Sequence, residues 1–301
     1  MRIIYMGTPD FAVNALVSLV DAGHEVVACY TQPDKPKGRS KVLQPTPVKV
    51  KAFEYGIPVY QPVKLREAEN VEKIKQYAPD AIVVAAYGQI LPESILNIPK
   101  YGCINIHASL LPKYRGAAPI ERAIIDGESK TGVTTMYMAK GLDTGDIIEQ
   151  SVVSIMSDDT GETLTDKLAK TGAELILSTL DKLENGTAER TVQNDDESCY
   201  AAMLSKDMGD IDFTKPADEI ERLVRGLQPW PCAFTRIKGK SVKIYGACVT
   251  DAPEGTEPGQ ITGVTKKSFA IVCGEGQPEG KKPMDAAAFL AGNKLCDGER
   301  I

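Results

Sequence analysis

An asparagine and a histidine stand two residues apart at the end of an apolar run, in the segment CINIHASLLPKYRG that begins at Cys103. Side chains two residues apart on a β-strand project from the same face, so Asn105 and His107 are predicted to share one face. The proline and glycine that follow end the strand, and open α/β sheets carry their chemistry at the carboxyl ends of strands. His107 is one of two histidines in 301 residues, and histidine changes charge near neutral pH.

A glycine-bracketed loop, GLDTGD, begins at Gly141 and offers a carboxylate 36 residues after His107. An amide, an imidazole and a carboxylate supply what acyl transfer to an amine requires: donors for the oxyanion and an acceptor for the amine proton. The residues alone leave Asp143 and Asp146 as candidates, because Asp146 is also suited to cap the turn. The other histidine, His24, lies in a polar turn and is interpreted as a turn residue.

The stretch from Asn105 to Gly116, together with Asp143-Thr144-Gly145, resembles the signature of the folate-dependent formyltransferases. The resemblance implies 10-formyltetrahydrofolate as the one-carbon donor, with no metal. It places the catalytic asparagine, histidine and aspartate of the family on Asn105, His107 and Asp143, and so selects Asp143 over Asp146.

The same resemblance implies a folate site built from two loop segments. A pterin ring needs a narrow apolar slot edged by backbone donors and acceptors. The residues implied are Gly88, Gln89, Ile90, Leu91, Ser109, Leu110, Leu111 and Pro112. For Leu110 and Leu111, ordinary loop packing is the alternative.

A long basic loop rich in proline lies between residues 34 and 49, with five cations against one aspartate in a chain of net charge −6. Loops of this length are functional or disordered, and cations suit phosphates. The loop resembles that of the family members that act on methionyl-tRNA, with Arg39 at the place of their key arginine. The resemblance implies methionyl-initiator tRNA as the acceptor. It gives the tRNA-binding residues as Lys35, Lys37, Arg39 and Lys41. A solvated surface loop is the alternative.

Composition narrows the class of protein further. No apolar run approaches the ~20 residues that a membrane-spanning helix needs, and the N-terminus lacks the pattern of a secretion signal. Seven scattered cysteines without a C-x-x-C pair argue against a disulfide framework and a zinc site, and indicate a reducing cytoplasm. The negative net charge disfavours general nucleic-acid adhesion, so RNA binding requires a local patch. The resemblance implies a monomer.

Strands alternate with helices through the first half of the chain, which predicts an α/β fold with a Rossmann-like, doubly wound, mostly parallel sheet. The expected strands are 2–6, 26–30, 81–86, 102–106, 131–140 and 147–154, and the expected helices are 10–21, 46–55, 67–77, 117–126 and 163–184. The dinucleotide fingerprint G-x-G-x-x-G is absent after the first strand, where Pro9 removes a backbone donor.

Three regions are expected along the chain: a catalytic domain over 1–189, a polar linker over 190–207, and a small C-terminal, OB-like β-barrel domain over 208–301 that binds tRNA. In the last, a helix over 216–227 precedes strands at 233–237, 241–247, 260–265 and 268–273. Members of the family that the chain resembles usually carry a further strand after the position of Gly276, whereas Gln277 follows at once here. Either the barrel has lost a strand or the given chain omits a stretch.

Two other functions are alternatives to formylation of methionyl-initiator tRNA for translation initiation. A formyltransferase acting on a small-molecule amine, such as a sugar nucleotide or glycinamide ribonucleotide, shares the catalytic trio but lacks the basic loop in this form. A non-catalytic RNA-binding protein would use the basic loop and the barrel. It would have no reason to keep Asn105, His107 and Asp143 together.

Overall fold

The computed structural model describes residues 1–36, 42–266, 268–274, 277–280, 290 and 295–301. The chain divides into two compact units. The first comprises residues 1–116, 130–154 and 165–200, and the second comprises 117–129, 155–164 and 201–301. The predicted linker, 190–207, is therefore divided between them. No helix in the described part of the chain is long and apolar enough to cross a membrane.

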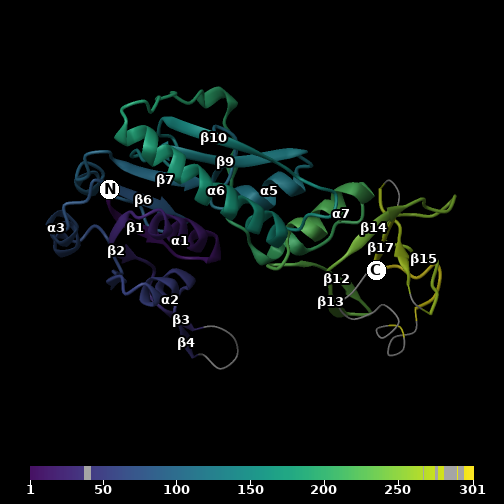
Figure 1. The fold of residues 1–301 in the computed structure, drawn as a ribbon. Coiled ribbons are helices and arrows are strands. Elements are labelled where there is room, and N and C mark those ends of the chain that lie inside the picture. Colours follow the sequence, from purple (N-terminus) through teal and green to yellow (C-terminus); the bar gives the residue numbers. More distant parts are fainter. Residues whose placement is uncertain (37–41, 267, 275–276, 281–289, 291–294) are drawn as a thin grey trace. The chain divides into compact units, whose positions relative to one another are not determined.

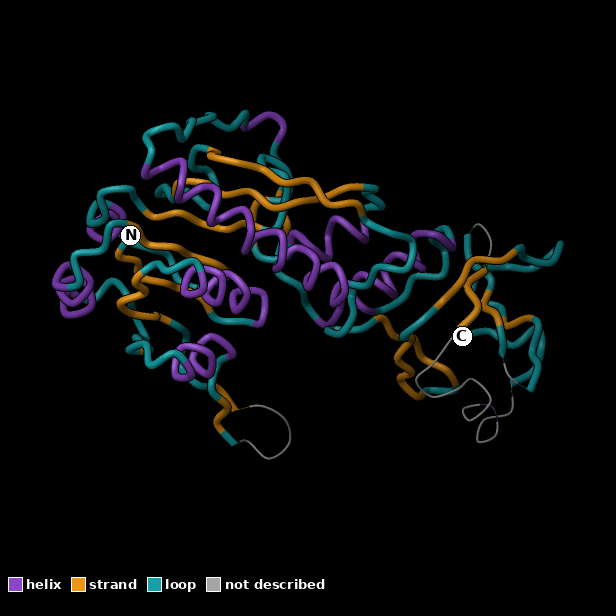
Figure 2. Tube along the Cα trace, in the orientation of Figure 1, coloured by secondary structure: helices purple, strands orange, loops and turns teal. Residues whose placement is uncertain are grey.

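A seven-stranded mixed sheet forms the centre of the first unit (Figures 1 and 2), in the order β10-β9-β7-β6-β1-β2-β5. Its strands are β1 (Arg2–Gly7), β2 (Glu25–Tyr30), β5 (Val59–Tyr60), β6 (Ala81–Ala85), β7 (Cys103–His107), β9 (Lys130–Tyr137) and β10 (Ile147–Ser154). Neighbouring strands from β7 to β5 run parallel, whereas β9 is antiparallel to β7 and to β10. The predicted Rossmann-like, mostly parallel sheet is confirmed.

The parallel strands are apolar because both of their faces are covered. Every residue of β6 is buried, and so are the side chains from Ile3 to Met6 in β1. The α-helices that begin before residue 190 are α1 (Val13–Asp21), α2 (Pro47–Glu54), α3 (Ala68–Gln76), α4 (Glu93–Leu96), α5 (Pro119–Ile125) and α6 (Gly161–Glu184). Helix α2 begins at a proline, and the Thr46 hydroxyl caps it by accepting a hydrogen bond from the Lys49 N–H.

Helix α6 lies over β7 and β9 (Figure 1), and this contact determines which face of β7 is free for chemistry. A Cβ added at Gly172 of α6 would lie 2.9 Å from Cγ2 of Ile106 and 3.5 Å from Cγ1 of Val133. Because side chains alternate along a strand, Asn105 and His107 project from the face opposite to Ile106. The helix thus fixes the orientation of the predicted pair.

The C-terminal part of the second unit contains helix α7 (Ala217–Gly226) and two small sheets. Strands β12 (Ala233–Ile237) and β13 (Lys240–Ile244) form a hairpin, and the four-stranded sheet β14-β17-β16-β15 uses Ala247–Thr250, Gln277–Gly280, Ala270–Ile271 and Ile261–Thr262. The hairpin turns through Lys238 and Gly239, with φ of 49° and 74°, as a two-residue turn requires. The predicted strand 241–247 is instead two strands of different sheets. Closure of these sheets into a barrel stays a prediction.

Candidate active site

His107 ends strand β7, and its two ring nitrogens face different groups. Its Nε2 lies 2.9 Å from the backbone carbonyl oxygen of Tyr114. Because a carbonyl only accepts hydrogen bonds, Nε2 carries a proton and donates it. Nδ1 is therefore the nitrogen left to exchange a proton. His107 is 6% exposed and Asn105, on the same strand face, is 9% exposed, so both are shielded from bulk water.

Asp143 is the aspartate that faces this ring. Its Oδ2 lies 3.7 Å from Nδ1 of His107 and accepts a hydrogen bond of 2.9 Å from the Gly116 N–H. Asp143 has a φ of +52°, a left-handed conformation that aspartate tolerates better than most residues. Asp146 instead contacts the end of β9, because its backbone carbonyl accepts a hydrogen bond of 2.9 Å from the Tyr137 N–H.

Two residues that the sequence did not single out, Gln193 and Arg115, lie beside this carboxylate. The Gln193 amide donates to the carbonyl oxygens of Asp143 and Gly145 at 2.8 and 2.7 Å. Its Oε1 accepts from Nε and Nη2 of Arg115 at 3.0 and 2.8 Å. Gln193 falls in the predicted linker. The polar composition of that segment gives no sign that one of its side chains is buried. Arg115 lies within the Asn105–Gly116 segment that carries the family resemblance, so the resemblance could have pointed to this residue.

The segment after His107 is held against β9 through Thr134. Ser109 is fully buried, and its hydroxyl donates to the Lys113 carbonyl at 2.7 Å. The Thr134 hydroxyl donates to the Ser109 carbonyl at 2.7 Å and accepts the Leu111 N–H at 3.1 Å. Leu110 packs over Gly132, Leu111 is buried and Pro112 is half-buried. Several of these predicted folate-binding residues are therefore engaged in packing the loop.

The second predicted folate segment has mixed roles. The Gln89 side chain donates a hydrogen bond to the Pro62 carbonyl and accepts one from the Leu65 N–H, both at 2.8 Å. These two hydrogen bonds fix the backbone that follows β5. Gly88 has a φ of +85° and lies against Gln32. Leu91 is buried, whereas Ile90 is 83% exposed. Folate binding by this segment stays a prediction.

The base of the basic loop is a short hairpin of β3 (Lys35–Pro36) and β4 (Leu43–Gln44). Lys35 is exposed, while Lys37, Arg39 and Lys41 lie outside the described residues. Lys49 Nζ binds Asp34 at 2.6 Å and Gln61 at 2.7 Å, so this cation is paired within the protein. Hydrogen bonds from Lys49 and Gln61 lower the pKa of the Asp34 carboxyl from its ordinary value.

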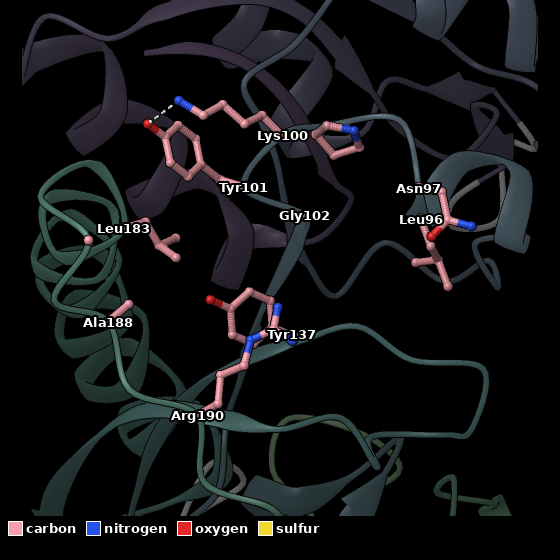
Figure 3. Close-up of a pocket in the computed structure, with 11 residues that line it drawn as sticks. Leu96, Asn97, Lys100, Tyr101, Gly102, Tyr137, Leu183, Ala188 and Arg190 are labelled. Carbon is pink, nitrogen blue, oxygen red and sulfur yellow. Dashed lines mark hydrogen bonds between the residues drawn. The ribbon is translucent and has the colours of Figure 1, made fainter.

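A cavity of about 440 Å³ opens elsewhere in the same unit (Figure 3). Lys100 donates to the Tyr101 hydroxyl at 3.0 Å, and the Arg190 guanidinium lies 3.7 Å from the centre of the Tyr137 ring. None of the predicted catalytic or folate-binding residues lines it. Among the described residues, no group of three or more His, Cys, Asp or Glu side chains is arranged to hold a metal ion.

The mostly parallel sheet carries Asn105 and His107 at the end of β7, and Asp143 lies beside His107. Comparison with known families shows which class of protein has this sequence and fold. Residues 1–180 match the formyl transferase family and residues 203–294 match the formyl transferase C-terminal domain. The chain belongs to the formyl transferase family.

Curated relatives show which members of the family this chain is similar to. The chain is 52% identical over 305 residues to a methionyl-tRNA formyltransferase of Agathobacter rectalis, covering 99% of this chain and 98% of the relative. It is also 52% identical over 305 residues to one of Alkaliphilus metalliredigens, covering 99% and 97%.

Solved structures share the fold at lower identity. An N-formyltransferase from Helicobacter canadensis, in complex with folinic acid and dTDP-3-aminofucose, superposes with a TM-score of 0.70 at 22% identity, over 94% of this chain and all of that one. HypX from Aquifex aeolicus, in complex with tetrahydrofolic acid, superposes with a TM-score of 0.66 at 17% identity, over 96% of this chain and 47% of that one.

Proposed function

We propose that this protein transfers the formyl group of 10-formyltetrahydrofolate to the α-amino group of methionyl-initiator tRNA, for translation initiation in the cytoplasm. The observation that carries the proposal is the 52% identity, over nearly the whole chain, to methionyl-tRNA formyltransferases. The Asp143 carboxylate beside His107 at the end of β7 supports the chemistry. The protein acts as a monomer.

The reaction replaces one C–N bond with another. The amine nitrogen forms a bond to the formyl carbon, the bond from that carbon to N10 of the folate breaks, and the amine proton passes to N10. Asn105 donates a hydrogen bond to the oxyanion formed on the way, and His107 donates a second one from Nδ1 once that nitrogen has taken up the amine proton. Since Nε2 of His107 is held by the Tyr114 carbonyl, Nδ1 exchanges the proton, and the Asp143 carboxylate 3.7 Å away stabilises the charged ring.

The basic loop binds the acceptor end of the tRNA in this proposal. Phosphate contacts from Lys35, Lys37, Arg39 and Lys41 supply affinity that falls with salt. The Asp34–Lys49 pair joins the two ends of the loop at 2.6 Å and so anchors the segment that carries these cations. Arg39→Ala is expected to weaken tRNA use far more than folate binding, and equal effects would contradict this assignment.

The deciding experiment incubates the protein with 10-formyltetrahydrofolate and methionine-charged initiator tRNA, with uncharged tRNA as the control. Formation of formyl-methionyl-tRNA supports donor, acceptor and reaction together. Separate reactions contain dTDP-3-aminofucose as the amine in place of the charged tRNA. Turnover of the sugar nucleotide, with none of the charged tRNA, would overturn the acceptor and keep the formyl chemistry.

A further inference from the structure

A single buried glutamine interrupts an exposed segment close to the candidate active site. Gln193 is 9% exposed, whereas its neighbour Val192 is 79% exposed. The segment leads from α6 toward the short strand β11 (Tyr200–Ala201). A polar side chain that is buried alone requires hydrogen-bond partners to offset the loss of water, and those partners identify its role.

Four hydrogen bonds of the Gln193 side chain lead to the catalytic region. Its Nε2 donates to the carbonyl oxygens of Asp143 at 2.8 Å and Gly145 at 2.7 Å. Its Oε1 accepts two hydrogen bonds from Arg115, at 3.0 and 2.8 Å. Arg115 directly follows Tyr114, whose carbonyl holds His107, and precedes Gly116, whose N–H holds the Asp143 carboxylate.

We propose that Gln193 is a positioning residue, which fixes the backbone of Asp143 so that its carboxylate stays beside His107. The inference rests on the proposed function for its effect on turnover. One amide joins the two segments that supply the partners of His107: the loop from Gly141 to Gly145 and the strand that contains Arg115.

The loop needs this support because Asp143 has a left-handed backbone. Its φ of +52° lies in the left-handed region, which residues that carry a Cβ seldom adopt. A hydrogen bond to the carbonyl of Asp143 itself holds the peptide plane that follows this conformation. Gly145 is fixed by the same amide and lies so close to the Tyr137 carbonyl that a Cβ there would overlap it.

Only an amide suits this position, because the groups around it demand donors on one side and an acceptor on the other. The two Arg115 nitrogens are donors and fix the direction of the amide. Glutamate keeps the size and the acceptor for Arg115, yet it places a carboxylate against two carbonyl oxygens. Methionine keeps the volume and loses the hydrogen bonds to both segments. Gln193→Glu and Gln193→Met therefore separate the amide donors from simple packing.

The test measures steady-state formylation of charged initiator tRNA by the wild type, both variants and Val192→Ser, an exposed neighbour, as the matched control. Misplaced catalytic groups lower kcat by about 10- to 100-fold, whereas KM for the tRNA is expected to change by no more than about twofold. Both variants are expected to show this loss, including Gln193→Glu, which keeps an acceptor for Arg115. Val192→Ser is expected to match the wild type.

A second readout does not depend on activity. The Gly116 N–H donates to the Asp143 carboxylate, so its hydrogen exchange, measured by NMR, reports whether that carboxylate is in place. Exchange is expected to be at least about tenfold faster in both Gln193 variants, as protection is lost when the partner moves. Exchange at the wild-type rate, or kcat of Gln193→Glu at the wild-type level, would overturn the inference.

The two proposals fail in different ways. An inactive wild type with bound folate would overturn the proposed acceptor, and the exchange rate of Gly116 would still decide whether Gln193 positions Asp143. If Gln193→Met does not fold, as shown by its thermal unfolding, the Gln193→Glu variant decides the question, since it preserves the volume of the side chain.

Discussion

The carbonyl oxygen of Tyr114 lies 2.9 Å from Nε2 of His107. Tyr114 has a φ of +59°, so the carbonyl that selects the ring nitrogen comes from a left-handed residue of the loop that follows the strand. The identity of the protonated nitrogen is thus encoded seven residues away from the histidine, in backbone conformation rather than in a side chain.

This contact predicts the tautomer of His107. In the neutral ring the proton is expected on Nε2, because the carbonyl can only accept. Long-range ¹H–¹⁵N correlation spectra distinguish the two tautomers, and the chain has only two histidines to assign. A His24→Asn variant removes the other set of signals. Observation of a proton on Nδ1 alone in the neutral ring would contradict the assignment.

Replacing His107 by alanine is expected to lower the rate of formyl transfer by roughly 10²–10³-fold, the usual effect of removing one oxyanion donor. The fold is expected to persist, since the ring's hydrogen bond to the backbone is made to a loop carbonyl, that of Tyr114. Rates under single turnover and thermal unfolding curves measure the two effects. His24→Asn, in the turn before β2, is the matched control, and a near-normal rate for His107→Ala would refute its catalytic role.

Asp143 offers a pair of variants that separates charge from conformation. An asparagine side chain at this position would still accept the Gly116 N–H and tolerate a positive φ, so Asp143→Asn is expected to keep the stability and lose activity. Asp143→Ala is expected to lose activity and also about 1–2 kcal/mol of stability, because alanine resists the left-handed conformation. Urea unfolding and formylation rates test both. Equal stability of the two variants would argue against the conformational cost, and Asp146→Asn serves as the control.

The Asp34–Lys49–Gln61 network predicts a dependence on pH. Hydrogen bonds from Lys49 and Gln61 hold the pKa of the Asp34 carboxyl below its ordinary value of 3.8. A depressed folded-state pKa stabilises the protein above the ordinary value, and this contribution is lost as the pH falls through the folded-state pKa. The free energies of unfolding of the wild type and Asp34→Asn are therefore expected to differ near neutral pH and to converge as the pH falls through the folded-state pKa, which lies below 3.8.

Urea unfolding at a series of pH values measures this convergence. Asp212→Asn is expected to converge with the wild type in the same way, because hydrogen bonds from Thr214 lower the pKa of that carboxyl. A difference between wild type and Asp34→Asn that stays constant down to acid pH would show that the ionised carboxylate is not the source.

Gly145→Ala is expected to disturb the catalytic loop, because the added Cβ would overlap the Tyr137 carbonyl oxygen. The loop must then shift, and a shift of about 1 Å at a catalytic group is enough to reduce the rate by roughly 10²-fold. Gly141→Ala is the control in the same loop, since the three atoms nearest to its added Cβ belong to the Thr144 side chain and not to the backbone. Similar rates for the two variants would contradict this interpretation of Gly145.

The elements that sequence reasoning predicted well are those whose signal is local. Burial on both faces makes β6 a continuous apolar run, and the alternation of Asn105, Ile106 and His107 follows from the strand period alone. The expected strand over 241–247 was wrong, because Tyr245 and Gly246 separate β13 from β14 and the chain changes sheets there.

The parts that the sequence did not reveal depend on long-range partners. Gln193 reaches Asp143 from 50 positions along the chain, and no periodic pattern marks a glutamine whose partners are backbone carbonyls. The resemblance predicts that the segment with Gln89 binds folate, and it gives no sign that the Gln89 amide also holds the backbone at Pro62 and Leu65. Contacts of this kind arise only when the folded chain brings the segments together.

One exposed cysteine lies beside the candidate active site and can carry a chemical label. Burial raises the pKa of the Cys103 thiol to about 12 and holds that side chain unreactive, since the thiolate is the nucleophile. Cys199 is exposed, and its Sγ accepts the Tyr114 N–H at 3.1 Å. A fluorescent dye on Cys199, with the exposed Cys296 and the half-buried Cys248 replaced by serine, would lie beside the peptide that holds His107. Its emission is expected to change when a substrate binds there.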